Sequence, residues 1–167
     1  GDTDSSSSSC TLRQAVYWAQ RTPGMSEVCL KDHLYEVEYG SMTIMNNVTI
    51  RSGENNYGSI ISGVKNGGMR LFDVTCDNTG SDDTVHGTAS SSGNINCTLA
   101  LGYVFIEDFV TDDDGDDGAV IALDPGASLD MEHTKFFGIE CRSCRGGVVH
   151  VNEGLHPTPA PTTLISH

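Results

Sequence analysis

Basic residues are scarce in this chain of 167 residues. Nine Lys and Arg stand against 23 Asp and Glu, which gives a formal net charge of −14. Because recognition of a phosphate backbone needs a basic surface, this balance excludes nucleic acid as a partner. It also disfavours binding to anionic membranes. No apolar run approaches the roughly 20 residues that span a bilayer, so we expect no membrane-spanning segment.

Aromatic residues are also few. Phe, Trp and Tyr together make up 7% of the chain, so the sequence indicates no aromatic platform for sugar binding. The six histidines show no metal-ligand spacing such as His-x-x-x-His. From these scarcities we assign no catalytic residue.

Six cysteines are present, an even number that favours three disulfides. We predict that each pairs with the next one along the chain. The last pair lies in Cys141-Arg-Ser-Cys144, for which a redox motif, half of a zinc site and free thiols are the alternatives. A redox motif needs a helix after a strand and a zinc site needs a second ligand pair, and neither context is visible. The predicted bridges are Cys10–Cys29, Cys76–Cys97 and Cys141–Cys144.

Two triplets match the acceptor pattern for N-glycosylation, at Asn47-Val48-Thr49 and Asn96-Cys97-Thr98. Such triplets are common by chance. Combined with paired cysteines and only three lysines, they predict a secreted eukaryotic glycoprotein that is extracellular or at the cell surface.

The chain divides into three segments. Residues 1–9 form a Ser-rich, flexible lead, residues 10–154 form one domain, and residues 155–167 form a Pro/Thr-rich tail or linker. The domain begins with a helix expected over 11–20. Thr11 and Gln14 fit a capping box, and Trp18 is expected to pack against the first strands.

Short β-runs separated by Gly, Asn and Asp fill the rest of the domain, a pattern typical of a sandwich, a barrel or a β-solenoid. An internal repeat distinguishes these three folds. When the sequence is shifted by 28 positions against itself, similar residues align over two stretches of the chain. A constant period is typical of a solenoid, whereas sandwich strands have no reason to repeat. The shift aligns Leu101 with Leu129, Phe109 with Phe137, Ile121 with Val149 and Leu123 with Val151.

The residues Cys10-Thr-Leu-Arg-Gln-Ala-Val resemble the "CSLREA" segment of secreted right-handed parallel β-helix proteins. The later Gly118-Ala-Val-Ile and Gly146-Gly-Val-Val runs resemble the repeats of polymorphic outer-membrane proteins and pectin-lyase-like solenoids. This resemblance implies an all-β fold, a right-handed parallel β-helix of about five coils, with a short N-terminal capping α-helix.

Many pectin-lyase-like solenoids cleave acidic polysaccharides, so the resemblance also raises an enzymatic function. Asn78, Asp82, Asp83 and His86 echo polygalacturonase signatures, but they are crowded into one loop between Cys76 and Cys97 and could not stack on successive coils. We therefore assign no catalytic site there.

Alternating acids at Asp112, Asp114 and Asp116 are spaced as ligands are in calcium loops. Two interpretations remain open for this loop, a hydrated turn between coils and a tentative Ca²⁺ site.

The leading functional hypothesis is non-enzymatic. It is a secreted, glycosylated structural or adhesive module, the repeating subunit of an extracellular fibre or surface appendage. Its partners would be further copies of itself or other extracellular proteins and glycans. The alternative is a polysaccharide-binding or lyase-like β-helix that acts on acidic glycans with Ca²⁺.

Overall fold

The computed structural model describes the chain in ten stretches. Within them the chain is mostly β-strand, every strand pairing is parallel, and one short helix precedes the first strand. The predicted all-β class with an N-terminal helix is thereby confirmed. The described residues are 10–22, 26–31, 34–38, 40–53, 58–64, 70–76, 97–111, 120–141, 147–152 and, for the backbone alone, 162–166.

The strands form three large sheets and a two-stranded one. The first sheet contains β1 (Glu27–Leu30), β4 (Val48–Ser52), β7 (Cys97–Gly102), β11 (Ala127–Glu132) and β15 (Thr162–Ser166). The second contains β2 (Leu34–Glu36), β5 (Ser59–Ser62), β8 (Val104–Glu107) and β12 (Lys135–Phe137). The third contains β3 (Met42–Ile44), β6 (Phe72–Val74), β10 (Ile121–Leu123) and β14 (Val149–Val151), and the fourth pairs β9 (Val110–Thr111) with β13 (Glu140–Cys141).

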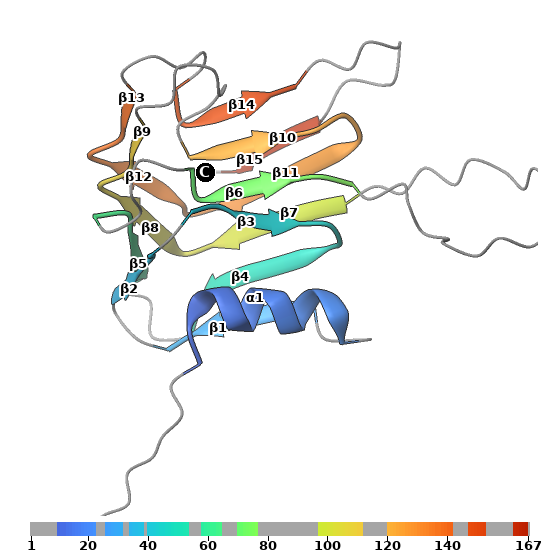
Figure 1. Cartoon of the computed structure of the whole chain (residues 1–167), viewed down its shortest axis with the longest axis horizontal. Helices are drawn as coiled ribbons and strands as arrows, with labels where there is room; N and C mark the ends of the chain where they lie inside the picture. The colour runs from blue at the N-terminus through green and yellow to red at the C-terminus, as the bar shows by residue number, and fades with distance from the viewer. Residues whose placement is uncertain are drawn as a thin grey trace, which may run out of the picture.

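The chain visits the three large sheets in a fixed order. From β1 it passes to the second sheet, then to the third, and returns to the first at β4, and this order repeats up to β15. We call one such passage a circuit. Figure 1 shows the strands of successive circuits lying above one another, starting from the helix. Within the segment 155–167, residues 162–166 also join this arrangement, because β15 pairs with β11.

The predicted repeat of 28 positions is correct in the third sheet and wrong in the first and second. In the third sheet Ile121 pairs with Val149, as expected. In the first sheet, however, Leu101 pairs with Met131 instead of Leu129, and the repeat there is 30. Phe137 likewise pairs with Glu107, and not with Phe109. The two periods differ because the connection from β13 to β14 is two residues shorter than the one from β9 to β10.

Parallel pairing in register stacks apolar side chains of successive circuits on one another. In the first sheet, Val48, Leu99 and Leu129 pair in sequence, and all three are at most 1% exposed. These inward residues alternate with outward ones along each strand, as a sheet with one buried face requires. The equivalent ladder of the third sheet consists of Met42, Phe72, Ile121 and Val149.

The helix α1 (Leu12–Arg21) covers the first circuit. Its predicted capping box is confirmed, since Thr11 accepts the Gln14 backbone N–H and the Gln14 side chain accepts that of Thr11. Leu12, Val16 and Ala19 form its buried face. Trp18 does not pack inward as expected, because it lies off this face and is 57% exposed.

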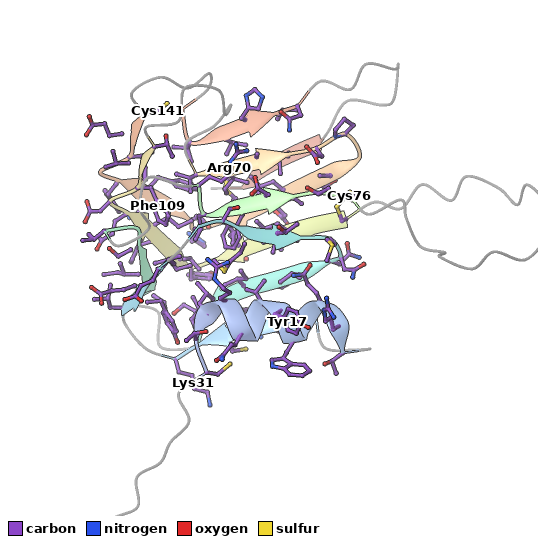
Figure 2. The ribbon with its side chains drawn as sticks, viewed as in Figure 1. Tyr17, Lys31, Arg70, Cys76, Phe109 and Cys141 are labelled. Atoms are coloured by element: carbon purple, nitrogen blue, oxygen red, sulfur yellow. A yellow bond between two sulfur atoms is a disulfide. The ribbon has the colours of Figure 1, made fainter. Side chains whose placement is uncertain are left out.

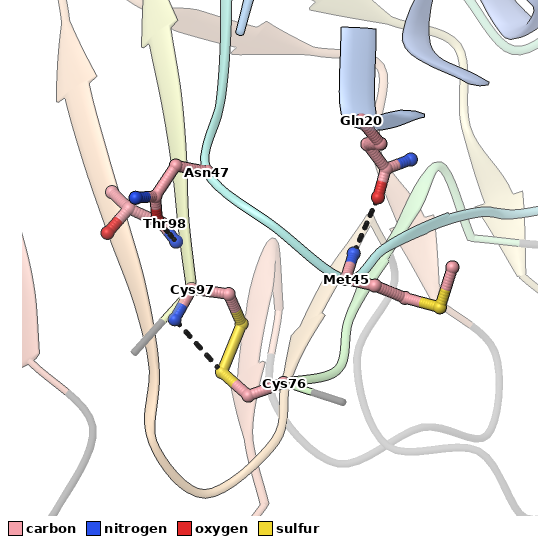
Figure 3. Close-up of a disulfide and its surroundings, with 6 residues drawn as sticks. All are labelled: Gln20, Met45, Asn47, Cys76, Cys97 and Thr98. Atoms are coloured by element: carbon pink, nitrogen blue, oxygen red, sulfur yellow. Dashed lines mark hydrogen bonds between the residues drawn. A yellow bond between two sulfur atoms is a disulfide. The ribbon is translucent and has the colours of Figure 1, made fainter. Parts of the chain in front are cut away.

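Polar side chains fasten α1 to the connections that flank β3. Arg13 donates to the carbonyl oxygens of Gly40 and Ser41 at 2.6 and 2.7 Å. Gln20 accepts the Met45 backbone N–H at 2.6 Å, an interaction drawn in Figure 3. These bonds hold the helix across the end of the stack, where it covers strand edges that would otherwise invite pairing with another chain.

Gly63 provides a test of the packing between circuits. Phe109 is fully buried (Figure 2), and a Cβ atom added at Gly63 would lie 2.6 Å from its ring. Because overpacking a rigid core costs about 1–3 kcal/mol, we expect Gly63→Ala to lower the free energy of unfolding by that amount. Chemical denaturation measures the change. Gly147→Ala is the control, since no atom lies within 4 Å of its added Cβ. Equal stability of the two variants would contradict this packing.

Candidate functional site

A hollow of about 580 Å³ lies on the outer face of the first sheet. Four neighbouring strands contribute to it, β1, β4, β7 and β11. It extends to the bend that follows β7, where the chain turns toward the second sheet. The residues that line it include Thr49, Arg51, Ala100, Gly102, Tyr103, Asp130 and Glu132.

Small residues on the central strand create this hollow. The outward positions of β7 hold Ala100 and Gly102, and the taller side chains stand on the strands to either side. Gly102 pairs with Arg51 of β4 and with Glu132 of β11. Ala100 pairs with Asp130 in the same way. The floor is therefore one strand wide, with walls that carry hydrogen-bonding groups.

The walls of the hollow are unequal in charge. Arg51 forms an ion pair with Glu27 on β1, and the hydrogen bond and charge of Glu27 raise the pKa of Arg51. Both side chains are about half exposed, so the pair contributes little to stability. Among the described residues, no basic side chain pairs with Asp130 or Glu132. The β11 wall is accordingly acidic, whereas the Arg51 charge is balanced.

An aromatic pair stands at the bend beside the hollow. The rings of Tyr103 and His133 lie 4.6 Å apart with an interplanar angle of 31°. Both backbones are left-handed, with φ values of 55° and 48°, which is costly for a side chain with a Cβ atom. Gly58 holds the same place in the preceding circuit with φ 70°, without that cost. The two strained residues thus present a stacked surface at the place where the earlier circuit has no side chain.

Sequence reasoning missed this pair because the predicted repeat of 28 does not relate positions 103 and 133. The true repeat of 30 in this part of the chain brings them together. Neither residue belongs to a recognisable motif, so only the register revealed the site.

A second hollow, of about 370 Å³, lies beside α1 and contains both Cys10 and Cys29. The predicted bridge between these two cysteines is wrong, because both are free and exposed. The Cys29 thiol points outward from β1 and donates to Glu27 at 3.3 Å, while the Cys10 thiol donates to the Thr11 carbonyl oxygen. Each sulfur is thus directed to a local acceptor and not to the other sulfur.

Of the other two predicted disulfides, one is confirmed and one lies partly outside the described residues. The Cys76–Cys97 disulfide is confirmed and joins the ends of β6 and β7 (Figure 3). Cys141 is also disulfide-bonded, while its predicted partner Cys144 lies outside the described residues.

Most of the other predicted site residues lie in stretches that the structure does not describe. This applies to Asp112, Asp114 and Asp116 of the tentative calcium loop and to the acceptor Asn96. Where side chains are described, no group of three or more His, Cys, Asp or Glu is arranged to hold a metal ion. In the same part of the chain, no helix has the length and apolarity needed to cross a membrane.

The second predicted N-glycosylation site, Asn47, lies within the described residues. It lies immediately before β4, its side chain is exposed, and its carbonyl oxygen Oδ1 accepts the Thr98 backbone N–H at 2.9 Å. Asn47 stands on the same outer face as the hollow, because Val48 next to it is buried and outward and inward residues alternate along β4.

Comparison of the chain with family models, curated proteins and solved structures gives no match.

Removal of the Cys76–Cys97 bridge tests its contribution to stability. It closes a loop with a sequence separation of 21, for which the loss of chain entropy in the unfolded state is worth about 3 kcal/mol. We expect the double variant Cys76→Ala/Cys97→Ala to lose that much free energy of unfolding in chemical denaturation. The variant keeps the Asn96-x-Thr98 triplet, so glycosylation is not altered. An unchanged denaturation midpoint would show that the bridge contributes nothing.

Proposed function

We propose that this chain is a secreted, N-glycosylated structural or adhesive module that serves as the repeating subunit of an extracellular fibre or surface appendage. Its scaffold would be a right-handed parallel β-helix of about five coils, with α1 as the N-terminal cap. Parallel strands joined by crossovers in one sheet are right-handed in about 98% of cases, which supports the handedness.

The fixed order in which the chain visits three parallel sheets carries this proposal. Circuits that stack in register along one direction are typical of solenoids, in which each repeat contacts its neighbours only. Such a stack is stiff along its axis and presents long outer faces. Those are properties that a fibre subunit or an adhesive surface needs.

The two ends of the stack favour end-to-end association. At the first circuit, α1 contacts β1, β3 and β4 and covers that end, so the surface available there is the outer side of the helix, where Tyr17 and Trp18 are exposed. At the other end, β12, β13 and β14 each pair with one strand among those the structure describes. Val149 and Val151 of β14 are only half-buried, while Ile121 and Leu123, their partners on β10, are fully buried. An apolar strand edge of this kind is a template for a further chain, and contacts between unlike ends generate filaments.

Negative-stain electron microscopy of the protein secreted by eukaryotic cells tests the assembly. We expect filaments whose axial repeat matches one molecule. Loss of the filaments in EDTA, and their return with Ca²⁺, would assign the acidic loop at Asp112, Asp114 and Asp116 to calcium. Dispersed monomers with and without EDTA, at concentrations up to the solubility limit, would contradict the fibre role.

A second candidate function is action on acidic polysaccharides with Ca²⁺. The observation in its favour is the hollow on the first sheet, where Arg51 faces Asp130 and Glu132 across a floor of small residues. The charge of −14 opposes it, because an anionic polymer would need calcium to bridge the repulsion. Incubation with pectate or alginate and Ca²⁺ decides the matter. Unsaturated products, seen by ultraviolet absorbance and absent in Arg51→Ala, would replace the structural proposal with an enzymatic one.

A further inference from the structure

We infer that the hollow on the first sheet holds the N-linked glycan attached to Asn47 of the same chain. The inference rests on the proposed secretion and glycosylation, and it goes beyond them by assigning the glycan a binding site on the protein surface. The ligand is thus the neutral inner part of an N-glycan, covalently tethered beside its site.

Asn47 is placed to deliver a sugar chain onto this face. The Thr98 backbone N–H holds Oδ1 of the Asn47 amide, as the pair in Figure 3 shows, and this bond fixes the orientation of the amide. The side chain is exposed, so its nitrogen, the atom that carries the glycan, is available on the outer surface. Asn47 therefore presents a preorganised attachment point instead of a freely rotating one.

The hollow begins at the next outward position. Thr49 follows Asn47 on the outer face of β4 and lines the hollow, and two residues of a strand span about 6.6 Å. On the neighbouring strand β7, the Thr98 backbone N–H donates to Asn47. The next outward residue of β7, Ala100, pairs with Thr49 and forms part of the floor of the hollow. A glycan that leaves Asn47 along the strands passes over Ala100 and Gly102 toward the bend at Tyr103.

The walls suit neutral sugars. Asp130 and Glu132 offer carboxylate oxygens to sugar hydroxyl groups, and Arg51 offers guanidinium N–H donors. At the far end Tyr103, which is 39% exposed, presents an aromatic surface for the apolar face of a pyranose ring, and His133 supports its ring from the next circuit. The inner N-acetylhexosamine and hexose units carry no charge, so the acidic wall does not repel them as it would repel a uronate chain.

The covalent attachment of the glycan gives it an advantage over a free polysaccharide in binding to the hollow. A ligand attached one step from its site binds intramolecularly, at an effective concentration in the millimolar range, so weak contacts suffice. A free neutral glycan would have to displace it, and a free acidic glycan would also have to overcome the charge.

Because the backbone of Tyr103 is left-handed, replacing this residue by glycine removes a glycan contact without disturbing the fold. Gly58 occupies the equivalent position in the preceding circuit with φ 70°, so Tyr103→Gly is compatible with this bend and removes only the ring. Tyr17→Ala is the matched control, because Tyr17 is an exposed aromatic residue on α1 (Figure 2) and does not line the hollow.

The experiment uses the full chain, secreted by cells that leave high-mannose glycans, with occupancy of Asn47 confirmed by glycopeptide mass spectrometry. The rate at which endoglycosidase H releases the Asn47 glycan from the native protein is then measured. We expect release to be roughly tenfold faster in Tyr103→Gly than in the wild type, as loss of an aromatic contact predicts. Release from Tyr17→Ala, and from Asn96 in every variant, should match the wild type. After denaturation the rates should become equal.

A thermal measurement gives an independent readout. Asn47→Gln should lower the Tm of the wild type more than that of Tyr103→Gly. The hydrogen bond from the Thr98 backbone N–H to Asn47 is disturbed in both backgrounds, whereas the contact between the glycan and the Tyr103 ring is lost only in the wild type. Equal release rates in wild type and Tyr103→Gly, or an equal Tm effect in both backgrounds, would overturn the inference. So would an unoccupied Asn47 in a protein glycosylated at Asn96, although secretion and the fibre role would stand. Absence of filaments would overturn the fibre role and leave the glycan site intact.

Discussion

Parallel strand pairing in register is the constraint on which the rest of this structure depends. Each strand forms its backbone hydrogen bonds with the equivalent strand one circuit away, so a residue that points inward in one circuit lies on an inward residue of the next. Val48, Leu99 and Leu129 form such a column. A slip of one residue would turn every apolar side chain of a strand to the outside, which fixes the register strongly.

The same constraint explains how the chain tolerates connections of different lengths. Val28 pairs with Ile50, whereas Ile50 pairs with the much more distant Leu101, and yet both pairings are in register. The additional residues lie between paired strands in the sequence, and the entropic cost of a longer connection grows only slowly with its length. Insertions can therefore differ from circuit to circuit while the sheets stay continuous.

Register also builds the candidate site. Outward side chains of neighbouring strands stand side by side, so two small residues on β7 produce a hollow that its neighbours wall in. At the bend, Gly58, Tyr103 and His133 fall into one column of left-handed residues, and two of them carry rings at a conformational cost. Strain of this kind persists only where surrounding structure enforces it, and it concentrates at functional sites. We propose that the continuous outer face that results supports the glycan of Asn47.

The sequence by itself determined the local features of this protein. The capping box of α1 and its buried face follow from residues three and four apart, and the β-runs follow from short-range alternation, so both could be predicted. The Cys76–Cys97 pairing also agreed with chain order. Only the tertiary structure decided which strands pair. The repeat is 30 where β7 pairs with β11, so Leu101 pairs with Met131 and not with Leu129, and it falls to 28 only at β14, after a connection that is two residues shorter. It also decided that Cys10 and Cys29 stay free and that Tyr103 meets His133 beside the hollow. Those contacts depend on where each circuit returns in space, which no local pattern of residues specifies.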